Sequence, residues 1–427
     1  CHLLAMLGMS VGERLDFDLW EKASAEAIAM ARDLDDDVLL TEALMGRQYL
    51  GEHWYEADLH LEAAEEALTV ARRVGSFALA GTLGAALVGW MKALAFDQID
   101  AHWQECRDLS RKYGDLGNVM HASVVHAVTL LQRGRLADAL SLMDDFARWS
   151  REVDFAWGSI LIEMTGFVSF LRGDWDRARE IYDEVKAKPI EGTMAGVESA
   201  YGAAFLTYIG DPGAAEALQA IEPRAAVAGQ HNQLGAWATA VALVEARAVR
   251  GEREACAAFY DVMVQLEDAG TRLAWNRGLV TRDGNELVVR VLATDPRSES
   301  MIMQAIFPTS ERISELSAKL EDAGTRLAWN RGLVSTLAGI AAAAGARWSK
   351  AEAHFEASEV LIERYGLDLA AAELLRWRGQ LALWRDADGD RATAQDLLTR
   401  AAEAYRALGM PRHVALAEGM SIGAGRN

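Results

Sequence analysis

The sequence predicts an all-α protein, an α-solenoid built from antiparallel helix pairs, and three observations lead to this fold class. The first is composition: 51% of the 427 residues are hydrophobic, and only six are proline, the residue that breaks helices. The second is a pattern of residue types that recurs about every 40 residues. The third is length, because a chain of this size exceeds one ordinary compact core, whereas a repeat array has no such limit.

The clearest copy of the repeated unit runs from Gly173 to Val185. Gly173 ends one helix, and an aromatic residue follows two positions later, a small residue at the fifth position and a large one at the ninth. Ala178, Tyr182 and Val185 then share one face of a helix, and the small alanine lets the preceding helix approach closely. This pattern is typical of the second helix of a helix-turn-helix repeat.

Eight further copies of the unit can be placed by the residue equivalent to Gly173. These residues are Asp18, Glu52, Asp97, Gly134, Gly210, Gly251, Ala346 and Gly389. Their spacings are 34, 45, 37, 39, 37, 41, 95 and 43 residues, so all but one lie near 40, slightly above the 34 of a minimal tetratricopeptide (TPR) unit. The sequence therefore predicts a TPR-like array, in which His102 and Ala215 take the small position of the copies at Asp97 and Gly210.

The one long spacing coincides with a direct repeat. Residues 266–280 and 320–334 share the sequence LEDAGTRLAWNRGLV at an offset of 54 residues, and removing one copy with the intervening segment restores the spacing. We therefore predict TPR-like repeats at 1–280 and 335–416, an insertion at 281–334 and a flexible tail at 417–427. The insertion is either a sequence-assembly product or a genuine lid or docking element, and an uninterrupted DNA read through both copies would remove the first explanation.

Charge and cysteine content restrict the partners and the compartment. The net charge of −20 disfavours a nucleic-acid backbone or an anionic membrane as partner. Cys1, Cys106 and Cys256 include no C-x-x-C pair, so neither a disulfide framework nor a structural zinc site is indicated, and we expect a cytoplasmic protein. The apolar run Phe77–Phe96 would just span a bilayer, but it ends where a repeat helix should end, so we expect a buried helix.

Motifs for catalysis, cofactors and metals are missing or incomplete, so we predict no catalytic, cofactor-binding or metal-binding residue. Asp386–Asp390 resembles the start of a calcium loop, but Arg391 and Leu397 stand where glycine and glutamate are needed, and a solvated turn that caps the next helix is expected. Asp35–Asp37 is predicted to be an acidic turn of the same kind. Four histidines are further candidates for metal ligands, namely His53, His60, His121 and His126. Their spacing does not suit a metal site, so we expect them to be surface or interface residues.

Thirteen tryptophans are the most unusual feature of the composition. Three of them, Trp54, Trp175 and Trp348, occupy the second position of the unit, where a bulky ring fills the gap between paired helices. Five fall on other apolar faces, namely Trp90, Trp149, Trp157, Trp377 and Trp384. We expect a packing role for most of them, while others line a groove that binds a peptide or a partner helix.

The last repeat, from Gly389 to Leu398 with Ala401-Ala402 and residues 407–411 after it, resembles a known family. It is similar to the closing repeat in the helical C-terminal regions of large bacterial signalling ATPases, including adenylate-cyclase-like proteins and ATP-dependent LuxR-type activators. The block 351–357 is similar to the preceding unit of that family. In these proteins the array senses a ligand or partner and regulates an ATPase or effector domain, but the resemblance carries over no catalytic residue.

We therefore expect a non-catalytic array that binds a protein or peptide in its groove, or a small ligand, within a longer bacterial signalling or transcriptional regulator. Direct binding of nucleic acid or membrane by this segment is not expected. One alternative is a stand-alone TPR-type scaffold for protein complexes, which an open reading frame without an upstream nucleotide-binding domain would favour. Another is an enzyme with an all-helical pocket, although no acid, base or metal set converges in the sequence.

Overall fold

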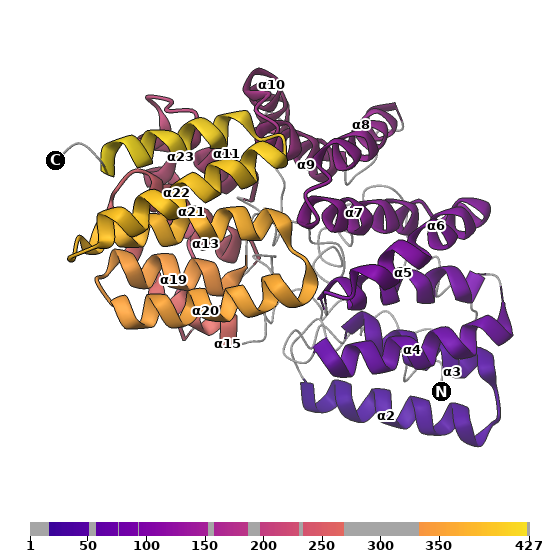
Figure 1. The fold of residues 1–427 in the computed structure, drawn as a ribbon. Coiled ribbons are helices and arrows are strands. Elements are labelled where there is room, and N and C mark those ends of the chain that lie inside the picture. The colour runs from indigo at the N-terminus through magenta and orange to yellow at the C-terminus, as the bar shows by residue number, and fades with distance from the viewer. Residues whose placement is uncertain are drawn as a thin grey trace.

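The computed structural model describes residues 17–50, 57–75, 77–92, 94–152, 158–186, 197–229, 234–268 and 333–424. Within these ranges the chain is helical with short turns and contains no strand, which confirms the predicted all-α class. Successive helices pack against one another along the chain (Figure 1). None of the described helices combines the length and apolar character needed to cross a membrane.

The helices of the first half of the chain are α2 (Phe17–Asp33), α3 (Asp37–Leu50), α4 (Ala57–Val74), α5 (Phe77–Lys92), α6 (Phe96–Tyr113), α7 (Leu116–Gln132), α8 (Leu136–Glu152), α9 (Gly158–Leu171), α10 (Trp175–Lys186) and α11 (Val197–Tyr208). Those of the second half are α12 (Ala214–Ile221), the 3-10 helix η2 (Glu222–Arg224), α13 (Leu234–Val249), α14 (Arg253–Ala257), α15 (Tyr260–Asp268), α19 (Val334–Ala344), α20 (Trp348–Tyr365), α21 (Asp368–Arg385), α22 (Asp390–Ala407) and α23 (Pro411–Ala424).

Two kinds of helix alternate along the chain. In α7, α13 and α19 none of the described side chains is exposed, and α19 is buried over its whole length. Helices α6, α8 and α10 instead bury one stripe and expose charged residues on the opposite side. A helix that is apolar all round belongs in the interior, whereas an amphipathic helix covers a surface. The first kind therefore forms an inner layer, and the second kind forms an outer layer that covers it.

The apolar run Phe77–Phe96 is a buried helix of this inner layer, as predicted. Helix α5 contains Leu83 and Leu87, both fully buried, and Trp90, which is 2% exposed. The helix ends at Lys92, and the next helix begins at Phe96.

A residue in the left-handed conformation stands between an inner helix and the outer helix that follows. Gly134, Gly173, Gly210 and Gly251 have φ between 69° and 82°, a region that L side chains rarely adopt. At Gly173 the backbone N–H donates to Phe170 O (3.0 Å), and the next N–H donates to Ser169 O (2.9 Å). This pair of bonds is the Schellman motif, which satisfies the last carbonyls of the inner helix and turns the chain back.

Ala346 adopts the same turn although it is not glycine. Its φ is 56°, its N–H donates to Ala343 O, and the following N–H donates to Ala342 O. Gly389 is also left-handed, with φ of 84°. These residues, with the four glycines above, are six of the nine from which the repeat spacing is measured in the sequence.

The structure corrects two of the predicted repeat positions. The turn assigned to Asp97 lies three residues earlier, at Leu94, where φ is 61° and the Schellman bonds are formed. Ile99 then takes the small position and is fully buried, whereas His102 does not. In the copy at Gly210, a longer turn starts helix α12 at Ala214, so Ala214 is buried and Ala215 is exposed.

Close packing within a helix pair depends on a glycine in the inner helix that faces a large residue of the outer helix. A Cβ atom at Gly339 would lie 2.4 Å from Cε1 of Phe355, and one at Gly379 would lie 2.8 Å from Cγ of Leu398. Phe355 and Leu398 occupy the ninth position of their units, and both are fully buried. Ala351, at the fifth position, is fully buried as well, as the repeat pattern predicts.

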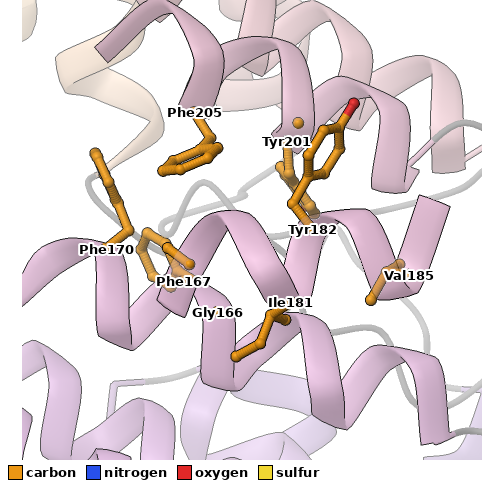
Figure 2. A pocket seen from close by; sticks show the side chains of 10 residues that line it. Gly166, Phe167, Phe170, Ile181, Tyr182, Val185, Tyr201 and Phe205 are labelled. Atoms are coloured by element: carbon orange, nitrogen blue, oxygen red, sulfur yellow. The ribbon is translucent and has the colours of Figure 1, made fainter. Parts of the chain in front are cut away.

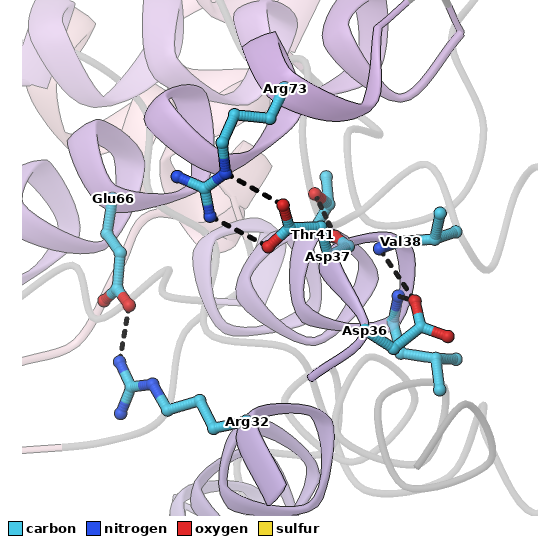
Figure 3. Close-up of polar contacts among 8 residues, drawn as sticks. Arg32, Asp36, Asp37, Val38, Thr41, Glu66 and Arg73 are labelled. Atoms are coloured by element: carbon cyan, nitrogen blue, oxygen red, sulfur yellow. Dashed lines mark hydrogen bonds and ion pairs between the residues drawn. The ribbon is translucent and has the colours of Figure 1, made fainter. Parts of the chain in front are cut away.

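Charged residues link neighbouring outer helices on the surface. Arg32 of α2 pairs with Glu66 of α4, and Arg73 of α4 forms a bidentate pair with Asp37 (2.8 Å for both bonds), as Figure 3 shows. Between α8 and α10, Arg151 forms a similar bidentate pair with Glu184. Exposed pairs of this kind are screened by water and salt, so they contribute little to the stability of the fold.

The helices on either side of the predicted insertion pack directly against each other. Tyr260 Oη of α15 lies 3.2 Å from Nε2 of His354 in α20, and His354 Nδ1 lies 2.8 Å from Oε2 of Glu267. Helix α15 also packs on α19. The insertion itself falls outside the described residues up to position 332, and α19 begins at Val334.

The C-terminal helices return to the middle of the chain. Figure 1 shows α21, α22 and α23 beside α11 and α13, whereas α2 to α6 extend to the other side of the molecule. A Cβ atom at Gly134 would lie 2.2 Å from a methyl carbon of Leu408, so the turn after α7 meets the end of α22. Helix α23 continues to Ala424 and fully buries Ala417, within the segment predicted to be a flexible tail.

We predict that Gly339→Ala lowers the free energy of unfolding by about 1–3 kcal/mol, because the added methyl group overlaps the ring of Phe355. The matched control is Gly419→Ala in α23, where nothing lies within 4 Å of the added atom. Alanine favours a helix over glycine, so the control should be neutral or stabilised by up to about 1 kcal/mol. Urea unfolding measures both, and equal stability of the two variants would contradict the proposed packing.

Candidate functional site

The interface where the C-terminal helices meet the central inner helices is the most distinctive site in the described part of the chain. Aromatic rings line it: Phe170 of α9 and His413 of α23 have ring centroids 5.4 Å apart. The guanidinium carbon of Arg412 lies 4.7 Å from the ring centroid of Trp175. Residues far apart in sequence therefore close the array on itself, and this part of the inner face is covered by the chain itself.

A buried ion pair lies at the centre of this interface. Glu373 and Arg376 are three residues apart on α21, and their side chains are only 3% and 1% exposed. Arg376 Nη2 donates to Glu373 Oε2 at 2.6 Å, and Arg376 Nε donates to Tyr405 Oη at 3.1 Å. Tyr405 in turn donates to Glu373 Oε1 at 2.8 Å. The three side chains thus form a closed ring of hydrogen bonds between α21 and α22.

Tyr208 extends this ring to the central helices. Arg376 Nη2 donates to Tyr208 Oη at 3.1 Å, across 168 residues of sequence, and Tyr208 donates to Glu245 Oε1. Tyr208 belongs to α11 and Glu245 to α13, where Glu245 is 4% exposed. We call the five residues Tyr208, Glu245, Glu373, Arg376 and Tyr405 the closure network. It joins four helices that the sequence places in different repeats.

The electrostatics of the closure network keep Arg376 charged. Burial alone would lower the pKa of its guanidinium, but the carboxylate of Glu373, with Tyr208 and Tyr405, outweighs burial and raises the pKa well above its ordinary value. Both carboxylate oxygens of Glu373 accept hydrogen bonds inside the network. The arrangement can therefore hold the helices at fixed positions.

The sequence pattern did not reveal the closure network, although one signal was present. Glu373 and Arg376 are charged residues three positions apart on a helix that buries half of its other residues. Charged residues are rarely buried unless they are paired, and a spacing of three places both on one helical face. Tyr208 and Glu245 carry no comparable local signal, because their partners come from distant repeats.

The acidic segment Asp386–Asp390 forms a turn, but it is only partly solvated. Asp386 and Asp388 are exposed as predicted, whereas Asp390 is 4% exposed, which the sequence did not predict. Arg385 forms a bidentate pair with Asp390 (2.8 and 2.6 Å), and this hydrogen-bonded guanidinium lowers the pKa of the carboxyl group. The side chain of Asp390 also accepts from the N–H of Ala387. Nowhere in the described ranges do three His, Cys, Asp or Glu side chains gather as a possible metal site.

The acidic turn at Asp35–Asp37 caps a helix, as predicted. Asp36 Oδ1 accepts from the N–H groups of Val38 and Leu39 at 2.9 and 3.1 Å, at the start of α3 (Figure 3). A side chain that accepts these bonds satisfies N–H groups that have no partner within the helix. This segment therefore has a structural role.

Among the four histidines singled out, the structure describes the side chain of His126 alone. It is 12% exposed and stacks on Trp103, with ring centroids 4.1 Å apart and planes 6° apart. Burial lowers the pKa of His126 to about 4, with Asp100 opposing this shift and Arg135, Arg133 and Arg107 adding to it. His126 is therefore a neutral, largely buried packing residue at pH 7. The side chains of His53, His60 and His121 lie outside the described ones.

The described tryptophans of the pattern pack as expected. Trp90 and Trp377 are 2% and 4% exposed, and Trp175 stacks on Phe170. The guanidinium carbon of Arg253 lies 5.6 Å from the ring centroid of Trp348 and 5.5 Å from that of Trp384. These cation–π contacts link α14 to α20 and α21. Trp149 meets Phe146 edge to face, while Trp54 and Trp157 fall outside the described residues.

The two described cysteines are free thiols in the core. Cys106 and Cys256 are both fully buried, and Cys256 Sγ donates to Val244 O at 3.4 Å. Burial raises the pKa of each thiol to about 12, so neither is a reactive thiolate near neutral pH. Both occupy buried positions of the repeat, where cysteine behaves as a small apolar residue.

Comparison with known proteins adds no family to these observations: no family model matches the chain, and neither does any curated protein.

We predict that Arg376→Met lowers the free energy of unfolding by about 3–5 kcal/mol, because it leaves the buried carboxylate of Glu373 without its cation. Adding Glu373→Met should restore part of this loss. The matched control is Arg400→Met, which removes the exposed partner of Asp396 and should change stability by less than about 0.5 kcal/mol. Urea unfolding of the four proteins measures these changes, and equal effects at positions 376 and 400 would rule out the network as the closing element.

We predict that His126 makes the protein less stable as the pH falls from 6.5 towards 4. In this window the unfolded histidine binds a proton and the folded one does not, so the unfolded state gains stability. Between pH 7 and pH 4.5 the wild type should lose roughly 2 kcal/mol more than His126→Gln. Urea unfolding at the two pH values measures the difference, and the same pH dependence in both proteins would show that His126 titrates normally in the folded state.

Proposed function

We propose that this chain is a TPR-like helical-repeat array that senses a ligand or protein partner and performs no catalysis of its own. The observation that carries this proposal is the Schellman turn with a left-handed residue that precedes an outer helix at Leu94, Gly134, Gly173, Gly210 and Gly251. These five residues are 37 to 41 positions apart, and a further turn of the same kind ends the outer helix α6 at Gly114. Repeats of this size that stack through apolar inner helices are typical of solenoids that bind other molecules.

The closure of the array supports a regulatory role rather than a purely structural one. Solenoid repeats contact mainly their neighbours, so a network between α11 and α21 gives this array a contact that can be made or broken as a unit. A partner that prefers either form would shift the equilibrium between them. The buried pair of Glu373 and Arg376 gives the closed form a defined geometry.

We further propose that the array belongs to a bacterial signalling or transcriptional regulator with an attached ATPase or cyclase, and that its state controls that domain. The support is the resemblance of the last repeat, Gly389–Leu398, to the closing repeat of such proteins. A protein or peptide bound to the array, or a small ligand, would provide the signal. A stand-alone scaffold would use the same surfaces without an attached enzyme.

The test has two steps. The purified chain should hydrolyse ATP and GTP no faster than buffer, and measurable turnover that survives further purification would contradict a non-catalytic array. In the longer protein that joins the array to a nucleotide-binding domain, Arg376→Met should change the rate of ATP hydrolysis at least threefold, whereas Arg400→Met should not. An unchanged rate, or a reading frame that encodes no such domain, would favour the scaffold.

A further inference from the structure

A small cavity lies where α9, α10 and α11 meet (Figure 2). Its volume is about 40 Å³, and it is partly open to solvent. Aromatic rings of α9 and α11 line it, and α10 contributes aliphatic side chains and the ring of Tyr182. The larger side chains of these walls are Phe167, Phe170, Tyr201, Phe205, Ile181, Tyr182 and Val185.

The cavity exists because the core is interrupted at this joint. Ile181 and Val185 form a small apolar cluster with Ala147 that is separate from the main core. Helices α10 and α11 touch each other much less than α8 and α9 do. Protein interiors are otherwise filled almost without voids, so an unfilled space between two repeats is a specific feature of this joint.

Two glycines shape the walls. A Cβ atom at Gly202 would lie 1.9 Å from Cε2 of Tyr182, so the ring of Tyr182 lies close against the backbone of α11 at this glycine. A Cβ atom at Gly166 would lie 2.8 Å from a methyl carbon of Ile181. At these two glycines the side chains of α10 contact α9 and α11. The cavity is the open space between these two contacts.

The chemistry of the lining selects the class of ligand. No lining residue is charged, and the surface consists of aromatic and aliphatic groups with two tyrosines. A cavity needs a volume of roughly 10–15 Å³ to hold one water molecule, and an engineered apolar cavity of roughly 150 Å³ binds benzene. A cavity of about 40 Å³ is therefore too small for a benzene ring and large enough for a short aliphatic group. The open side leaves room for the rest of a longer molecule.

We propose that this cavity is a binding site for the short aliphatic group of a small molecule, such as a propyl or isopropyl group. Binding fills the space between α10 and α11 and joins the separate cluster of Ile181 and Val185 to the main core. The inference rests on the proposed sensing function, for which it identifies a ligand site and a ligand class. It concerns a small molecule because the volume admits a few carbon atoms and not a helix.

The probes are xenon, 1-propanol and 2-propanol. Their binding is measured by the chemical shifts of the methyl NMR signals of Ile181 and Val185. All three should shift these signals in a saturable manner. Val185→Phe fills the cavity with its larger side chain and should weaken the shifts at Ile181 at least tenfold. The matched control is Val360→Phe, the same substitution at a residue of α20 that is 63% exposed, and it should bind like the wild type.

Several outcomes would overturn the proposal. Signals of Ile181 that do not respond to xenon in the wild type would show that the cavity is closed or already filled, and this measurement needs no variant. An equal response in Val185→Phe would place binding elsewhere. Binding of leucine-containing peptides without binding of xenon or the alcohols would identify a peptide site instead. None of these results bears on ATP hydrolysis by the longer protein, so the proposed function stands or fails separately.

Discussion

The left-handed turn between an inner and an outer helix is the constraint on which the rest of this structure depends. At Gly173 it reverses the chain within two residues and satisfies the last carbonyls of the inner helix. The turn fixes the rotation of the outer helix about its own axis. Ala178 therefore packs against the inner helix, and the charged side of the outer helix faces water. The same turn recurs at Gly251 and Ala346, whereas the turn at Gly210 is longer. A glycine such as Gly339, facing Phe355, then determines how closely the pair can pack.

The closure network adds a constraint that the repeats do not supply. Stacking of neighbours alone would leave the two ends of an array independent. Here Arg376 connects the C-terminal helices to Tyr208 at a distance of 168 residues along the chain. A buried charge is tolerated only with a partner, so Glu373 and Arg376 require each other, and their shared bonds to Tyr405 specify one arrangement. The C-terminal helices are therefore held in one position against the middle of the chain.

The sequence predicted the turns where glycine marks them and misplaced one where it does not. Gly134 and Gly251 signal a positive φ by their residue type, whereas Leu94 takes the same conformation with no such signal. Ala215 was misplaced because a turn with Pro212 and Gly213 delays the start of α12 to Ala214, four residues after Gly210 instead of two, and the buried position falls at Ala214. Asp390 was expected in solvent, and its burial depends on Arg385, five residues earlier in the chain.

By itself the sequence determined the helical class and some of the small residues that become buried, such as Ala178 and Ala351, since these depend on local conformation and on the periodicity of apolar residues. The tertiary structure alone decided the closure network and the cavity beside α10. Tyr208 meets Arg376 only when the C-terminal helices pack against the middle of the chain. The cavity is the space that side chains from three helices leave unfilled. Neither depends on a local pattern, because each is a sum of contacts between residues that the chain brings together from separate repeats.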